Sequence, residues 1–293
     1  MKYLLLFLAS FGALTSHCQN EEDLLKGVAD TMPKKEKVYN AFKSSRVIMS
    51  QSMEMLRPGV LDFRILHRFG NVNQGLSQFF GLDQASIRLG LDYGLSNNLS
   101  VGIGRSSFRK EVDGFAKWRA VQQSTGLNSF PVSLIAVGGA TIIGAPWTGP
   151  ENKNNLTSRT AYYTQAIIGR KFSERLTLQA APIFLHRNYV ETAADPNDVF
   201  GAGVGGRLKL SKRVSLNVDY YYVANKNDAR DLHNPLSIGF DIETGGHVFQ
   251  LHFTNAVGMN ERAFLTETTN SWGRGDIQFG FNISRAFQIA KKK

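Results

Sequence analysis

The sequence predicts an all-β fold, an antiparallel transmembrane β-barrel of about twelve strands. Apolar and polar residues alternate along much of the chain, for example over residues 214–223 and 277–284. A period of two gives each strand one apolar and one polar face. Large apolar residues on one face and charged residues or glycine on the other are typical of a wall between lipid and a polar lumen. No part of the last third of the chain predicts a helix.

The N-terminus has the pattern of an export signal. Lys2 precedes the apolar run Leu4 to Leu14, which is followed by Cys18 and a polar stretch from Gln19. This run is too short to span a bilayer, so residues 1–18 are predicted to be a secretory signal peptide. Cleavage after Cys18 and lipidation of Cys18 are both open, and the bulky His17 favours cleavage. Since Cys18 is the only cysteine, no disulfide is expected.

The basic composition bears on possible partners. The net charge of +10 and the pI near 9.7 would ordinarily suggest nucleic acid. The predicted export argues against a nucleic-acid partner. A cationic lumen, or a surface facing anionic lipopolysaccharide in the outer membrane, is the better interpretation. We therefore expect outer-membrane lipids and a small solute as partners, and the oligomeric state is left open.

The chain divides into four predicted parts. Residues 1–18 are the signal peptide, and residues 19–57 form a charged N-terminal segment with little alternation, expected in the periplasm as a candidate site for partner proteins. Residues 58–288 form the transmembrane barrel, and residues 289–293 form a basic tail.

The barrel strands follow from the alternation and the turn residues between them. They are predicted near Val60 to Phe69, Gln84 to Leu95, Leu99 to Phe108, Phe115 to Gln122, Val132 to Ile143, Ser158 to Arg170, Arg175 to Arg187, Asp198 to Leu210, Val214 to Val223, Leu236 to Thr244, His247 to Asn255 and Asp276 to Phe287. Pro182 removes a ladder donor, which predicts a bulge or a strand end there. The alternate glycines from Gly201 to Gly205 are expected to make room for long side chains across the lumen.

The lengths of the connections predict the orientation. Short turns, such as Ser96 to Asn98 and Gly245-Gly246, alternate with long polar loops, such as Gly70 to Asp83 and Ala256 to Gly275. Outer-membrane barrels have short turns on the periplasmic side and long loops outside. Both ends of the barrel domain are therefore predicted to be periplasmic, although the long connection Gln122 to Phe130 fits this scheme less well.

Several segments resemble a known family. These are HRFG (His67 to Gly70), LDQASIRLGLDYG (Leu82 to Gly94), SIGFDIETGGHVFQLHFTN (Ser237 to Asn255) and GMNERAF (Gly258 to Phe264). They are similar to signal-peptide-bearing β-barrel proteins of unknown function from the outer membranes of Bacteroidota. The resemblance implies an outer-membrane barrel and brings no catalytic residues, ligand or cofactor.

Strand parity places a set of charges on the inward faces. These candidate lumen-lining residues are Asp62, Arg64, Arg68, Arg88, Asp92, Lys117, Arg119, Arg207, Lys209, Asp219, Asp241 and Glu243. In one interpretation, they form ion pairs that fill a closed interior. In the other, the arginines attract small anions along a selective path. Because Arg88 faces the lumen, its replacement by leucine is expected to alter only the lumen.

Enzymatic and metal chemistry are further alternatives for the sequence. Asp241, Glu243 and His247 flank one turn, but their register is open and we expect no metal or cofactor. An outer-membrane lipid hydrolase would need a serine near a histidine, and His67 with Ser50 or Ser52 are the candidates. No such pair is evident on neighbouring outward positions, so the protein is not expected to be an enzyme.

The sequence thus favours a channel or passive transporter for small polar or anionic solutes. The alternative is a non-conducting structural or docking barrel. In that case, the segment from Gln19 to Leu56 and the loop from Ala256 to Gly275 would bind partner proteins.

Overall fold

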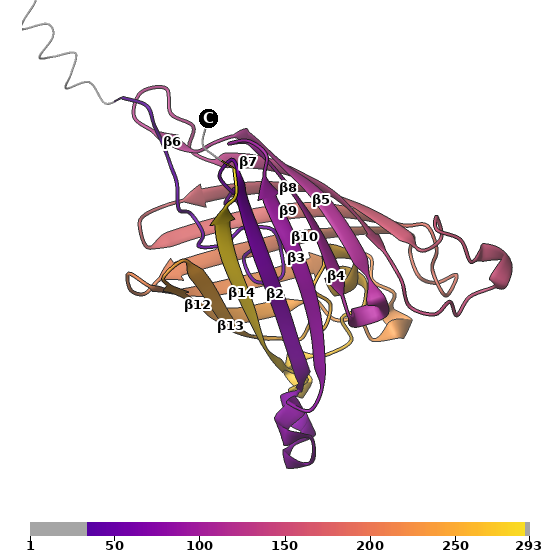
Figure 1. The fold of residues 1–293 in the computed structure, drawn as a ribbon. Helices are drawn as coiled ribbons and strands as arrows, with labels where there is room; N and C mark the ends of the chain where they lie inside the picture. The colour runs from indigo at the N-terminus through magenta and orange to yellow at the C-terminus, as the bar shows by residue number, and fades with distance from the viewer. Residues whose placement is uncertain (1–33, 291–293) are drawn as a thin grey trace, which may run out of the picture.

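The structure, a computed structural model, describes residues 34–290 and shows a closed antiparallel barrel (Figure 1). Neighbouring strands around the wall follow the chain order, and the last strand pairs with the first to close it. The predicted signal peptide and the start of the predicted N-terminal segment lie outside the described residues. The predicted fold class is confirmed.

All twelve predicted barrel strands are present, with small shifts at their ends. They are β2 (Val60–Asn71), β3 (Ala85–Gly94), β4 (Leu99–Ser106), β5 (Val112–Val121), β7 (Ser133–Ile142), β8 (Thr160–Lys171), β9 (Leu176–Arg187), β10 (Asp198–Lys209), β11 (Val214–Val223), β12 (Leu236–Thr244), β13 (His247–Thr254) and β14 (Gln278–Gln288). Closure leaves no strand edge in the hydrocarbon, where unpaired backbone groups cost several kcal/mol each.

The two faces of the wall divide as the alternation predicts. On β3, Leu89 and Leu91 are exposed to the outside, whereas Arg88 and Asp92 on either side of them are buried in the barrel. Aromatic side chains such as Phe200 and Phe240 extend the outer apolar surface. No helix within residues 34–290 is long and apolar enough to cross a membrane.

The prediction at Pro182 is wrong. Pro182 pairs with Ala202 in an unbroken register between β9 and β10, and the register with β8 is the same on both sides of it. The register shifts lie elsewhere, between Arg119 and Val121 and between Gln278 and Gly280. The backbone therefore tolerates one missing ladder donor without a bulge.

Short elements lie outside the wall. β1 (Glu36–Lys37) pairs with β6 (Ser124–Thr125), which explains why the connection between β5 and β7 is long for a periplasmic turn. The long loops carry 3-10 helices η1 (Val72–Gln74), η2 (Leu76–Gly81), η3 (Phe108–Lys110), η4 (Glu151–Lys153), η5 (Asp228–Arg230) and η6 (Trp272–Arg274), together with the α-helix α2 (Glu261–Thr266). The sequence does not predict α2, because six residues are too few to show a helical period.

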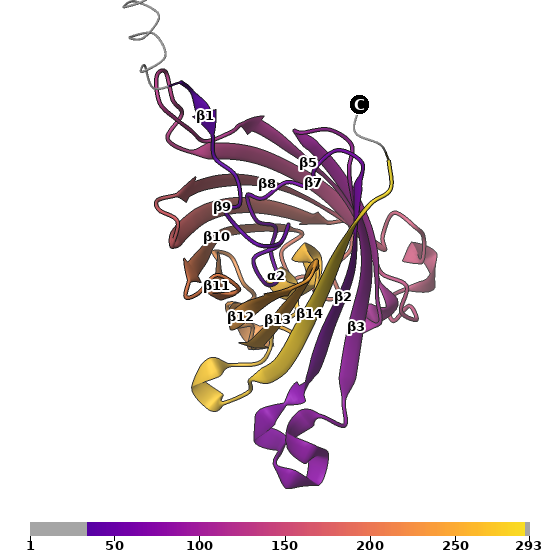
Figure 2. The same ribbon diagram turned by 60° about the vertical axis from the view of Figure 1, so that its left-hand side comes forward.

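Two segments fill the interior of the barrel. Figure 2 shows the chain after β1 entering the barrel and α2 lying inside it. We call residues 41–55 the N-terminal hairpin. Most of its side chains are buried, so the expectation that residues 19–57 lie in the periplasm is wrong for this part. The physical reason is that the lumen offers this segment apolar side chains to pack against as well as hydrogen-bond partners, whereas water offers only the latter.

Candidate functional site

The N-terminal hairpin turns back tightly inside the lumen. The backbone N–H of Val47 donates to the carbonyl of Ser50 at 2.9 Å, and that of Ser52 donates to Ser45 at 2.9 Å. Arg46 and Gln51 form an antiparallel bridge below the tip. Every residue from Val47 to Ser52 is no more than 1% exposed. The tip is therefore packed on all sides inside the lumen.

One carboxylate of the wall binds the tip. Asp219, on β11, accepts hydrogen bonds from the backbone N–H groups of Ile48 (3.2 Å), Met49 (2.8 Å) and Ser50 (2.9 Å). The hydroxyl of Ser50 donates to the other carboxylate oxygen at 2.9 Å. Successive backbone N–H groups at a turn form a concave anion site. Here the barrel supplies the anion and the hairpin supplies the site.

Further side chains of the wall bind the hairpin backbone. Lys117 donates to the carbonyls of Ser45 at 3.2 Å and Glu54 at 2.7 Å, and Arg207 donates to that of Ala41 at 3.0 Å. The remaining contacts with backbone atoms come from Gln179 (to Gln51 and Met53), Gln250 (to Val47) and Asn282 (to Ile48). Arg64 instead donates to the hydroxyls of Ser44 and Ser45.

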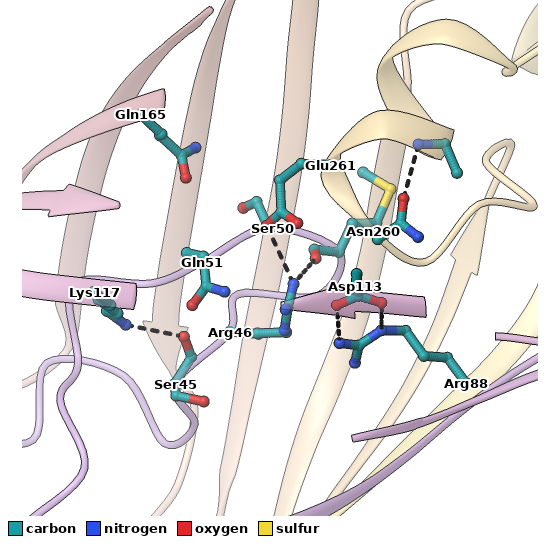
Figure 3. A network of polar contacts seen from close by, with 12 residues as sticks. Ser45, Arg46, Ser50, Gln51, Arg88, Asp113, Lys117, Gln165, Asn260 and Glu261 are labelled. Atoms are coloured by element: carbon teal, nitrogen blue, oxygen red, sulfur yellow. Dashed lines mark hydrogen bonds and ion pairs between the residues drawn. The ribbon is translucent and has the colours of Figure 1, made fainter. Parts of the chain in front are cut away.

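Other charges of the wall pair with one another. Arg88 forms a two-pronged ion pair with Asp113 on β5, with Nε to Oδ1 at 2.8 Å and Nη2 to Oδ2 at 2.5 Å (Figure 3). Arg64 also donates to Asp62 at 3.1 Å. Some charges therefore pair within the wall and others bind the hairpin, and the anion-selective path stays a prediction.

The structure buries ten of the twelve candidate lumen-lining residues inside the barrel. Of these, six are cationic and four are acidic: Arg64, Arg68, Arg88, Lys117, Arg119 and Arg207, and Asp62, Asp92, Asp219 and Asp241. Lys209 is partly exposed. Glu243 is also partly exposed, near the periplasmic end of the barrel, and forms an ion pair with Lys43 of the hairpin.

A second arc of the lumen is apolar and was not predicted. Buried apolar or aromatic side chains from β7 to β11 pack against the hairpin and α2; they are Ile135, Val137, Tyr163, Ile167, Ala181, Ile183, Leu185, Val199, Tyr221 and Val223. On β9, apolar residues occupy both faces, which is the sequence signal that could have revealed a packed interior. The inward glycines make room as expected, since a Cβ on Gly203 would lie 2.3 Å from the Tyr221 ring.

The long loop between β13 and β14 enters the lumen from the opposite end. Asn260 caps α2 by accepting from the N–H of Ala263 at 2.9 Å, and its amide donates to Glu111 at 2.6 Å. Phe264 packs on Tyr221 with ring centroids 5.2 Å apart. Arg46 at the hairpin pairs with Glu261 at 3.3 Å, so the two insertions meet (Figure 3).

Burial and ion pairs act in opposite directions on the acidic groups around α2. Burial raises the pKa of Glu261 above its ordinary value, and Arg46 opposes this rise. Burial also acts to raise the pKa of Glu267, but Arg262 and Arg109 outweigh it, and the pKa is lowered. Glu267 is therefore held as a carboxylate between two arginines.

The candidate residues for a hydrolase do not come together. Ser50 and Ser52 are buried in the lumen, where Ser50 binds Asp219 and Ser52 donates to the carbonyl of Ser44. His67 packs on Phe281 with ring centroids 4.8 Å apart, at positions of the lipid-facing surface. Within residues 34–290, no group of three His, Cys, Asp or Glu side chains is placed to hold a metal ion.

Comparison with known proteins agrees with this architecture. The sequence matches the family described as Membrane bound beta barrel domain (DUF5777) over residues 42–287. The chain belongs to this family. The matched range of the DUF5777 domain begins within the N-terminal hairpin, so the hairpin counts as part of the domain.

Solved porin structures are similar in fold to this DUF5777 chain. The NanC porin has a TM-score of 0.51 at 10% identity, covering 78% of this chain and 98% of that one. The KdgM porin has a TM-score of 0.46 at 7% identity, covering 78% and 99%. No curated protein matches the sequence. The protein is an outer-membrane, porin-like β-barrel.

Proposed function

We propose that the protein is a gated channel for small polar solutes, closed in the described state by its N-terminal hairpin. The observation that carries this proposal is the bonding of Asp219, Lys117 and Arg207. These charges of the wall bind the hairpin, so the hairpin occupies the path that they would otherwise line. When the hairpin leaves, they face water.

The topology lets the hairpin leave the lumen without any chain end passing through the barrel. Its first residues follow β1, which pairs with β6 in a periplasmic turn. Its last residues lead through Pro58 and Gly59 directly into β2 at the same end of the barrel. Because both ends of the hairpin are at one opening, it can withdraw as a loop toward the periplasm while every barrel strand stays paired.

The hydrogen bonds that hold the hairpin are of a kind that water can replace. A hydrogen bond to a charged group contributes about 1.5–3 kcal/mol in net terms, because the separated groups bond to water. Once open, the eleven buried charges on the strands of the wall, which include Asp113, carry an excess of one positive charge, six against five. This excess supports a weak preference for anions.

Planar-bilayer recording of the full chain tests the proposal. We expect long closed periods with rare openings, and a reversal potential in a KCl gradient that favours chloride. Arg207→Gln should reduce that preference, whereas Arg213→Gln, at an exposed periplasmic turn, should not. A permanently open pore, or openings that favour potassium, would contradict the proposal.

The apolar arc favours a second candidate, a non-conducting barrel. The side chains of β7 to β11 pack on the hairpin and α2 as in the core of a soluble protein. In this case, part of the N-terminal segment, including Glu36–Lys37 at the rim, would bind a periplasmic partner. Complete silence in the bilayer at every voltage, with a correctly folded barrel, would favour this candidate.

A further inference from the structure

We propose that a cavity under the long loops binds an oxyanion, a carboxylate or phosphate group borne by a free solute or by a lipid headgroup. The cavity has a volume of about 60 Å³ and lies between α2 and the loops that follow β7 and β9. Its charged lining consists of five arginines and two glutamates, which are Arg109, Arg159, Arg187, Arg230, Arg262, Glu191 and Glu267. The inference does not depend on gating, because none of these residues contributes a bond to the hairpin described above.

Three of the arginines are paired with carboxylates. Arg109 reaches Glu191 at 3.3 Å and Glu267 at 2.8 Å. Arg262 pairs with Glu267 at 2.8 Å and with Glu111. Arg230 pairs with Asp195 at 3.4 Å.

The other two arginines have only neutral partners among the described residues. Arg159 donates to the amide oxygen of Asn154 and to the carbonyls of Ile143 and Ala145. Arg187 donates to the carbonyl of Pro196 at 2.5 Å. Neither guanidinium forms an ion pair among the described residues, although Asp195 and Glu267 lie near enough to act on Arg187, and an anion in the cavity would supply a direct partner.

Unpartnered donors also point to a ligand. Arg262 is 2% exposed, and its Nε is buried with no hydrogen-bond acceptor; the Nε of Arg187 is in the same condition. A buried N–H group without an acceptor is unfavourable. The planar guanidinium fork matches a carboxylate or phosphate, so an oxyanion in the cavity would satisfy these donors.

The rest of the lining limits the size of the bound group. Trp147 packs on Tyr189 with ring centroids 4.6 Å apart, and the guanidinium of Arg159 lies 5.3 Å from the Trp147 ring. These contacts hold Arg159 in place. The cavity, with a volume of about 60 Å³, can take a small charged group, and the remainder of a larger ligand would lie outside it.

Titration of the full-length protein with inorganic phosphate, in an uncharged detergent, tests the site. We expect saturable binding by calorimetry that weakens by about tenfold or more in the double variant Arg159→Gln/Arg187→Gln. The matched control Arg213→Gln removes the same kind of charge at an exposed turn and should bind as the wild type does. Gel mobility before and after boiling checks that each variant is a folded barrel.

Phosphorus analysis of the purified protein distinguishes the two sources. Retained lipid phosphate in the wild type, absent from the folded double variant, identifies a lipid headgroup. Phosphate binding without retained lipid identifies a free solute. If the wild type binds no phosphate and retains no lipid phosphate, or if the folded double variant equals the wild type in both measurements, the proposal is wrong.

Discussion

Asp219→Ala is expected to raise the frequency of channel openings by about 100-fold or more. The substitution removes the acceptor of three backbone N–H groups and one hydroxyl at the tip of the N-terminal hairpin. Each buried donor left without an acceptor costs about 1–3 kcal/mol. The closed state thus loses at least about 3 kcal/mol, and each 1.4 kcal/mol is a factor of ten in an equilibrium. In the open state, the same N–H groups bond to water.

Single-channel recording measures this effect, with two companion variants. Ser50→Ala removes only the hydroxyl bond and should raise openings by less than Asp219→Ala does. Asp83→Ala removes an exposed carboxylate in an outer loop and should leave the openings unchanged. An Asp219→Ala barrel that is folded, by gel mobility, and opens no more often than the wild type would show that the hairpin does not gate the lumen.

Arg88→Leu is expected to destabilise the barrel by about 3–5 kcal/mol, because it leaves the carboxylate of Asp113 buried without its partner. From the sequence, this change was expected to alter only the lumen. The structure revises that expectation, since the two-pronged pair with Asp113 joins β3 to β5 across β4. A Cβ on Gly104 of β4 would lie 2.2 Å from the Arg88 guanidinium, which therefore passes directly over β4.

The double variant Arg88→Leu/Asp113→Leu provides the control for this prediction. Removal of both charges should recover most of the lost stability, because replacing a buried ion pair with apolar side chains is often nearly neutral. Urea unfolding from lipid vesicles, followed by tryptophan fluorescence, measures the free energy of unfolding. Equal losses in the single and the double variant would mean that the ion pair is not the cause.

The alternation made the wall predictable, because it is a local property of each strand. Leu89 and Arg88 are adjacent, and a period of two sends them to opposite faces whatever the rest of the chain does. The hairpin has no such period. Its position depends on side chains far away in the sequence, such as Asp219, which lies 169 residues from Ser50. The sequence therefore places individual charges in the lumen, but it does not identify the groups that they bind there.

The same distinction between local pattern and long-range contact applies at the end of the barrel that carries the long loops. Glu261 and Arg262 look like solvated loop residues in the sequence, and their burial is explained only by Arg46, Glu111 and Glu267. Trp147 and Arg159 belong to a loop whose contacts with Tyr189 the sequence does not reveal. Sites built from such separate loops become visible only in the folded chain.

A reversible covalent lock between the hairpin and the wall tests the gating account most directly. A Cβ on Gly169 of β8 would lie 3.1 Å from the Cβ of Met53, close to the 3.5–4.5 Å or so that a disulfide spans. Cys18 is the only cysteine of the natural chain, so Met53→Cys/Gly169→Cys introduces a single defined pair into the barrel. The single variant Met53→Cys is the control.

Planar-bilayer recording of the locked protein, before and after addition of a reducing agent, gives the decisive result. The account predicts no openings in the oxidised double variant, and openings at least as frequent as those of the wild type after reduction. The single variant should conduct under both conditions. Openings in the oxidised double variant as frequent as those after reduction would contradict the claim that withdrawal of the hairpin opens the lumen.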